Sequence, residues 1–228
     1  MDRPGTIPDE SWRGPAGDEE QRGVDRLAAR LEQTPESDAT SPEAGRNGSL
    51  ERLQFPGAAT RVMTRLLLRD VHHYLFNSVH EPRPGTSYRV QDEVRARAVA
   101  ALLAGSDREP PHVVVSHSLG TVIAYDCLKR LPDCPSVDGL ITVGSPLGIE
   151  EIPEQLRPEW SPNDGFPNRR LAGDWVNIFD RLDPVAGTAP ELGPTYRYRG
   201  LPAVIDLEEA NWGKWRHDIG KYLRGSAL

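Results

Sequence analysis

A serine stands between a predicted strand and a predicted helix, with small residues on either side. The stretch VVVSHSLGTVIAYD begins at Val113 and places Ser118 two residues after Ser116 and two residues before Gly120. A turn this tight accepts only small side chains at those two positions, and it presents the central hydroxyl at the edge of a sheet. The sequence therefore predicts that Ser118 is a nucleophile. The alternative is a plain strand-to-helix turn whose hydroxyl caps the helix.

A serine hydroxyl needs a general base, and the base needs an acid that orients it. After the predicted strand WVNIF comes DRLDPVAG, which offers Asp180 and Asp183 at the edge of the sheet that carries the serine. We favour Asp183 and keep Asp180 as the alternative acid, which would otherwise brace the loop. His217 is the one histidine that follows them. The order serine, acid, histidine is that of strand-and-helix serine hydrolases.

Two residues next to the serine complete this part of the prediction. Leu119 would begin the following helix, so its backbone N–H is the expected first donor to an oxyanion. His117 occupies the variable position of the turn and is expected to be structural or to line the pocket.

Alternating strand and helix patterns must position these residues. Short β-branched runs predict buried strands, and apolar residues at three- and four-residue spacing predict helices. Their alternation indicates an α/β fold with a mostly parallel sheet flanked by helices. The expected strands are 112–116, 140–143, 175–179 and 204–207, and the expected helices are 24–33, 62–76, 91–103, 121–131 and 215–223.

Composition divides the chain and excludes several classes of function. Residues 1–54 are rich in Pro, Gly, Ser and charge, which predicts a mostly disordered or loosely docked segment before a domain at 55–228. A net charge of -7 argues against nucleic acid as a partner. No apolar run is long enough for a membrane span, and the start resembles no secretory signal. With only Cys127 and Cys134, no disulfide framework is expected. We expect a soluble, cytoplasmic protein without a cofactor.

Other charged and imidazole groups have ordinary interpretations. His72, His73 and His80 lack the spacing of a metal site, so no metal is expected. Asp126 is expected to be a surface or packing residue of the serine helix. Arg95 and Arg97 are expected to form a solvated helix face.

Five segments together resemble the α/β-hydrolase superfamily of serine esterases and lipases, and more closely a lipase-like set common in actinobacteria. They are RDVHHYL, VVVSHSLGTVIAYD, LITVGSPLG, WVNIFDRLDPVAG and HDIGKYL, and they extend over residues 69–223. The resemblance implies a triad of Ser118, Asp183 and His217. It also implies that GSPLG lines the floor of the pocket through Gly144 and Ser145, with Ser145 packing against the backbone.

One departure from this family's pattern lies before Ser116. No strand ending in His-Gly is found there, so the loop that supplies the second oxyanion donor and the first strands of the sheet are expected to be absent. Residues 1–110 are expected to contain helices and linker. Absent strands would leave an exposed sheet edge at which a second copy could pair.

The expected function is hydrolysis of a carboxylic ester or thioester, either a small molecule or an acyl carrier, through an acyl-enzyme. An incomplete oxyanion hole would reduce the activity. Two alternatives stay open: an acyltransferase that uses the same triad, and a hydrolase-fold interaction domain with weak or no activity. Residues 150–174 form a polar insertion that is either a lid, with Trp160 and Phe166 covering an acyl group, or an irregular surface loop.

Overall fold

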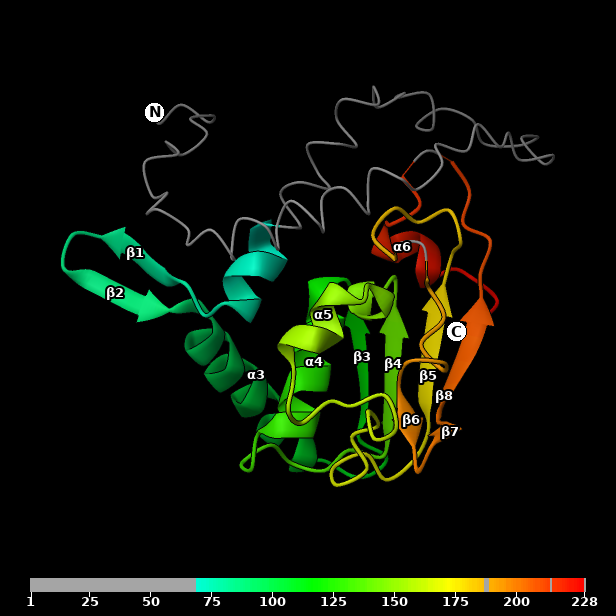
Figure 1. Cartoon of the computed structure of the whole chain (residues 1–228), viewed down its shortest axis with the longest axis horizontal. Coiled ribbons are helices and arrows are strands. Elements are labelled where there is room, and N and C mark those ends of the chain that lie inside the picture. Colours follow the sequence, from blue (N-terminus) through cyan, green and yellow to red (C-terminus); the bar gives the residue numbers. More distant parts are fainter. Residues whose placement is uncertain (1–68, 187–188, 214, 228) are drawn as a thin grey trace.

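The computed structural model describes residues 69–186, 189–213 and 215–227 (Figure 1). Within these residues, four parallel strands form one sheet in the order β3-β4-β5-β8. The arrowheads of these strands in Figure 1 all point towards α6. The prediction of an α/β fold with a parallel sheet flanked by helices is therefore confirmed. The strands are β3 (Val113–His117), β4 (Gly139–Val143), β5 (Trp175–Phe179) and β8 (Val204–Glu208).

The helices follow the predicted positions, with one that is much shorter than expected. Residues 69–75 are helical, and the expected helix at 24–33 and the first part of that at 62–76 lie outside the described residues. The last helix was expected over 215–223 but is limited to four residues, because the Asp218 side chain caps it by accepting the N–H of Lys221. The other helices are α3 (Val90–Ser106), α4 (Leu119–Arg130), η1 (Pro146–Gly148), α5 (Glu151–Gln155) and α6 (Ile219–Tyr222).

Two short hairpins were not predicted. Strands β1 (Val79–Arg83) and β2 (Thr86–Arg89) pair antiparallel, so the expectation of only helices and linker before residue 110 is wrong. All their residues are exposed, which removes the alternation of apolar and polar residues that signals a strand. The second hairpin pairs β6 (Arg197–Tyr198) with β7 (Leu201–Pro202).

The main core lies on the face of the sheet that α4 covers. Leu140, Trp175 and Val204 are in register on adjacent strands and are all buried. Tyr125 of α4 stacks on Trp175 with ring centroids 5.5 Å apart. This packing holds α4 against the sheet.

The opposite face of the sheet is covered near its carboxyl end. There Tyr222 of α6 packs with Val143 and Ile178 in a second apolar cluster. Towards the edges, Val115 and Ile205 are half exposed. Among the described residues no strand pairs with the outer edge of β3, and pairing of a second copy at this edge stays a prediction.

A buried ionic cluster joins three helical segments. The Asp126 carboxylate has no exposed surface, and it accepts hydrogen bonds from Tyr74 (2.6 Å), from Arg95 (2.7 and 2.9 Å) and from Arg130 (3.1 Å). The expectation that Arg95 is solvated is thus wrong, because only 17% of its side chain is exposed. Arg97, with 75% exposed, does face solvent.

The buried thiols of Cys127 and Cys134 should make the folded protein less stable at alkaline pH. Burial raises the pKa of Cys127 to about 12 and that of Cys134 to about 11, above the usual 9.0. In the unfolded chain these thiols ionise near pH 9, so their contribution is complete below that pH and is lost as the pH rises towards 11–12. We expect the free energy of unfolding to fall between pH 8.5 and 10, by at most about 1.4 kcal/mol per pH unit for each thiol.

Urea unfolding of the reduced protein at several pH values measures this slope. The variant with Cys127→Ala and Cys134→Ala should show a shallower slope over the same interval. An equal slope in both proteins would contradict the assignment to the thiols.

Candidate active site

Ser118 occupies a strained backbone conformation between β3 and α4. Its φ is 55° and its ψ is -131°, a combination that side-chain-bearing residues rarely adopt and that persists only when the surroundings hold it. The N–H of Ser118 donates to the carbonyl of Val143 (3.2 Å), and its carbonyl accepts the N–H (2.9 Å) and the hydroxyl (2.7 Å) of Thr121. The neighbouring strand and the first turn of α4 therefore hold the strained serine from both sides.

Space around the turn is not limiting on the side of Gly120. An ideal Cβ there would meet no atom within 4 Å outside its own chain neighbours and helix backbone. An alanine would therefore fit at this position, and the expectation that larger side chains would collide there stays a prediction. The crowded glycine of the site is Gly144, at the end of β4.

Gly144 lies directly against Asp183 and His217, the predicted acid and base. It has φ +54°, and a Cβ at this position would lie 2.9 Å from Asp183 Oδ2, 3.1 Å from His217 Nδ1 and 3.1 Å from Tyr222 Cε2. The backbone of β4 thus approaches Asp183 and His217 so closely that no side chain fits between them. The next residue, Ser145, is buried and bonds to the hydroxyl of Thr121 (2.8 Å) and to the N–H of Leu147 (3.2 Å).

Asp183 and His217 form a buried pair 34 residues apart in the chain. His217 Nδ1 lies 2.8 Å from Asp183 Oδ2, and the two residues are 6% and 0% exposed. The other carboxylate oxygen accepts the N–H of Val185 (2.8 Å). Because a carboxylate accepts at Nδ1, the proton of a neutral imidazole sits there and Nε2 is left as the basic nitrogen.

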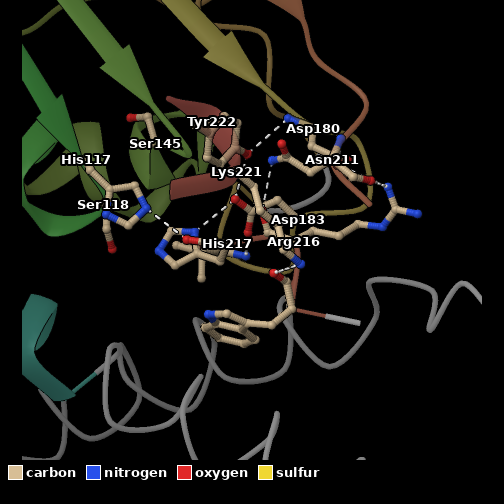
Figure 2. Close-up of polar contacts among 12 residues, drawn as sticks. His117, Ser118, Ser145, Asp180, Asp183, Asn211, Arg216, His217, Lys221 and Tyr222 are labelled. Carbon is tan, nitrogen blue, oxygen red and sulfur yellow. Dashed lines mark hydrogen bonds and ion pairs between the residues drawn. The ribbon is translucent and has the colours of Figure 1, made fainter. Parts of the chain in front are cut away.

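The two atoms that would exchange a proton are both buried and unbonded. Ser118 Oγ and His217 Nε2 have no hydrogen-bond partner among the described residues. In Figure 2, His217 is drawn between Asp183 and Ser118. Hydrogen bonds between a nucleophile and its base are often long before substrate is bound, so the missing bond is compatible with a triad.

His117 supports the loop that carries the base. Its Nε2 donates to the backbone carbonyl of His217 (2.9 Å), and the two rings lie 4.5 Å apart. Burial, and then the nearby charge of His217, lower the pKa of His117, so that it stays neutral near pH 7. This placement agrees with the expected structural role.

Asp180, the alternative acid, bonds to the chain segment before His217 and not to the His217 ring. Its carboxylate accepts the N–H of Leu182 (2.7 Å), the N–H of Asn211 (2.8 Å) and the guanidinium of Arg216 (3.1 Å). Arg216 precedes His217 and also donates to the carbonyl of Asn211. Of the two candidate acids, the structure pairs Asp183 with His217 and places Asp180 in the brace beside it.

The polar insertion does not cover this site with its aromatic residues. The ring centroids of Phe166 and Trp175 are 6.3 Å apart, and Trp175 begins β5 at the end of the sheet remote from Ser118. Trp160 is buried in the main core cluster. The interpretation of these two residues as a cover for an acyl group is therefore wrong, because both are used in core packing.

One residue of the site was missed. The hydroxyl of Tyr222 bonds to Asp183 Oδ2 (2.8 Å), and the sequence segment HDIGKYL contains it without any signal of that role. Leu119, the expected oxyanion donor, is the first residue of α4.

Two further observations bear on what the protein could bind. No group of three or more His, Cys, Asp or Glu that could hold a metal occurs in the part of the chain that the structure describes. No helix within the described ranges is long and apolar enough to cross a membrane.

Comparison with known proteins identifies no family for the chain. No protein-family model matches it, and neither a curated protein nor a solved structure does.

Proposed function

We propose that the protein is a serine hydrolase of the α/β-hydrolase type that acts on a carboxylic ester or thioester. The observation that carries the proposal is the strained Ser118 at the sheet edge, near a buried His217 that Asp183 orients. Strain of this kind persists where surrounding structure holds it, and such residues cluster at active sites. The buried, unbonded hydroxyl and imidazole nitrogen add to this support, because each needs a partner that a substrate complex would provide.

The reaction proceeds in two halves through an acyl-enzyme. Ser118 Oγ attacks the acyl carbonyl while His217 Nε2 takes its proton, and the tetrahedral oxyanion accepts the N–H of Leu119. Collapse breaks the bond to the leaving alcohol or thiol, which receives the proton from His217. Water then attacks the ester of Ser118 with His217 again as the base, which releases the acid and restores the serine. An acyltransferase would use another acceptor in place of water.

A second candidate is an interaction domain that retains the fold with little activity. The observation in its favour is the outer edge of β3, which is unpaired among the described residues. It predicts that Ser118 is not reactive, which separates it from the first candidate.

Labelling with a fluorophosphonate tests the proposed function directly. The wild type should acquire one adduct at Ser118, located by peptide mass spectrometry, and Ser118→Ala should acquire none. Ser106→Ala is the matched control. Ser106 is the last residue of α3, and its hydroxyl bonds to the carbonyl of Leu102 and to the His112 ring, away from the proposed triad. An unlabelled wild type, or a Ser118→Ala variant labelled as fast as the wild type, would contradict the proposal.

A further inference from the structure

Tyr222 lies at the centre of the contacts that hold the acid. Its side chain is fully buried, and its ring packs against Val143 and Ile178 below the carboxyl end of the sheet. The hydroxyl lies 2.8 Å from Asp183 Oδ2, the same oxygen that meets His217 Nδ1 at 2.8 Å (Figure 2). One carboxylate oxygen thus faces two donors from different parts of the chain.

The direction of the hydrogen bond is fixed by a third group. The backbone N–H of Asp180 donates a hydrogen bond to the phenolic oxygen of Tyr222 (3.1 Å), so this oxygen is the acceptor in that bond. A carboxylate can only accept, so the phenolic proton points to Asp183 Oδ2. Burial, and then the charge of Asp183, raise the pKa of Tyr222, which keeps the hydroxyl protonated and a donor near neutral pH.

We propose that Tyr222 is a positioning residue of the triad: its hydroxyl holds Asp183 Oδ2 in place and sets how strongly that oxygen stabilises a charged His217. The proposal rests on the proposed function in one respect, that His217 is the base for Ser118. The hydrogen bonds themselves are independent of the reaction. Tyr222 touches no substrate and acts through Asp183.

The hydrogen bond from Tyr222 changes how much negative charge Asp183 Oδ2 presents to His217. A hydrogen bond from Tyr222 withdraws negative charge from Oδ2, so less of that charge stabilises the imidazolium of His217. Removal of the phenolic oxygen should therefore favour the charged imidazole. The neutral base would then form only at a higher pH.

Other charged or titratable groups near His217 do not reproduce this effect. His117 faces the ring from β3, and burial lowers its pKa. Asp180 forms an ion pair with Arg216, and the Asp218 side chain caps α6 by accepting the backbone N–H of Lys221. Replacement of Tyr222 by phenylalanine changes none of these charges, so a shift in titration reports the lost hydroxyl.

The test compares Tyr222→Phe with Tyr74→Phe. Tyr74 is a matched control, because its buried hydroxyl also donates to a buried carboxylate, that of Asp126, at 2.6 Å. The rate of fluorophosphonate labelling of Ser118 is measured from pH 5 to 9. We expect the midpoint of the acid limb to move up by roughly half a pH unit in Tyr222→Phe, and the plateau rate to fall about tenfold. The Tyr74→Phe midpoint should equal that of the wild type.

A second readout does not need the reaction. Titration of histidine ring signals by NMR, with His217 assigned by its absence in His217→Asn, should show the same upward movement of its midpoint in Tyr222→Phe. An unchanged midpoint for His217 in Tyr222→Phe overturns the proposal, even if labelling is slower. If the wild type is not labelled at all, the proposed function fails, while the NMR midpoint still decides the role of Tyr222.

A non-natural residue covers the case in which Tyr222→Phe does not fold. With 3-fluorotyrosine at position 222, the hydroxyl is a stronger donor and the bond to the Asp180 N–H is kept. The midpoint of His217 should then move down relative to the wild type. A midpoint that stays or moves up would overturn the proposal.

Discussion

Asp183→Asn is expected to lower the rate at which a fluorophosphonate labels Ser118 by about 10⁴-fold, with little change in the fold. The amide has the same shape as the carboxylate but no charge, so it neither stabilises an imidazolium nor reliably selects the Nδ1–H form of His217. Since Nδ1 lies 2.8 Å from Oδ2, an amide NH₂ in that place would favour a proton on Nε2, where the base must be free. The measurement is the second-order labelling rate at pH 8.

Asp180→Asn is the matched control, and it decides between the two acids that the sequence offers. Asp180 bonds to Asn211 and Arg216 and has no bond to His217, so its amide variant should retain labelling within about tenfold. It should lose stability, because Arg216 would lack a counter-charge. A larger loss of rate in Asp180→Asn than in Asp183→Asn would assign the acid to position 180 instead.

Most of what positions the site was readable from the sequence, because strong local signals coincide there. The run of valines before Ser118 and the β-branched runs of β4 and β5 each predict a strand to within about one residue of its observed bounds. Parallel strands bring their carboxyl ends to one edge of the sheet, so the predicted strand direction alone places Ser118 and Asp183 at the same edge.

What the sequence did not predict depends on contacts made only after packing. The resemblance places Gly144 on the floor of the pocket beside the triad, but it does not give the closeness of the approach: an added Cβ would lie 2.9 Å from Asp183 Oδ2, which depends on how three segments pack. Tyr222 reads as an ordinary apolar position of a closing helix, and its bond to Asp183 requires the short α6 to end against β4 and β5. The aromatic residues of the insertion were misplaced for the same reason, since composition does not say which end of a sheet a loop will cover.

The buried carboxylate of Asp126 is another such contact, and it concerns stability. Asp126 lies in α4, the helix that begins directly after Ser118. The side chains that donate hydrogen bonds to its carboxylate come from α3, from residues 69–75 and from α4 itself. Arg95 and Arg97 were expected to form one solvated helix face, although residues two positions apart lie on different faces of a helix. The structure separates them, because only Arg95 reaches the carboxylate.

Asp126→Asn is expected to lower the free energy of unfolding by about 3 kcal/mol. The amide keeps the size of the side chain, so no cavity forms, but Arg95 and Arg130 lose their shared anion while only 17% and 21% of their side chains are exposed. Loss of a counter-charge is more serious for buried than for exposed pairs, because water cannot replace it. For a domain of this size the melting temperature should fall by roughly 6–12 °C. Urea and thermal unfolding followed by circular dichroism measure both quantities.

Glu93→Gln makes the same chemical change in an exposed pair. Glu93 and Arg97 lie one turn apart on α3 with their charged atoms 2.8 Å apart, and their side chains are 40% and 75% exposed. Such pairs contribute about 0.5 kcal/mol or less, so this variant should unfold almost as the wild type does. Equal stability losses in the two variants would mean that Asp126 acts as a surface charge, and that burial of its ion pairs does not hold α3 against α4.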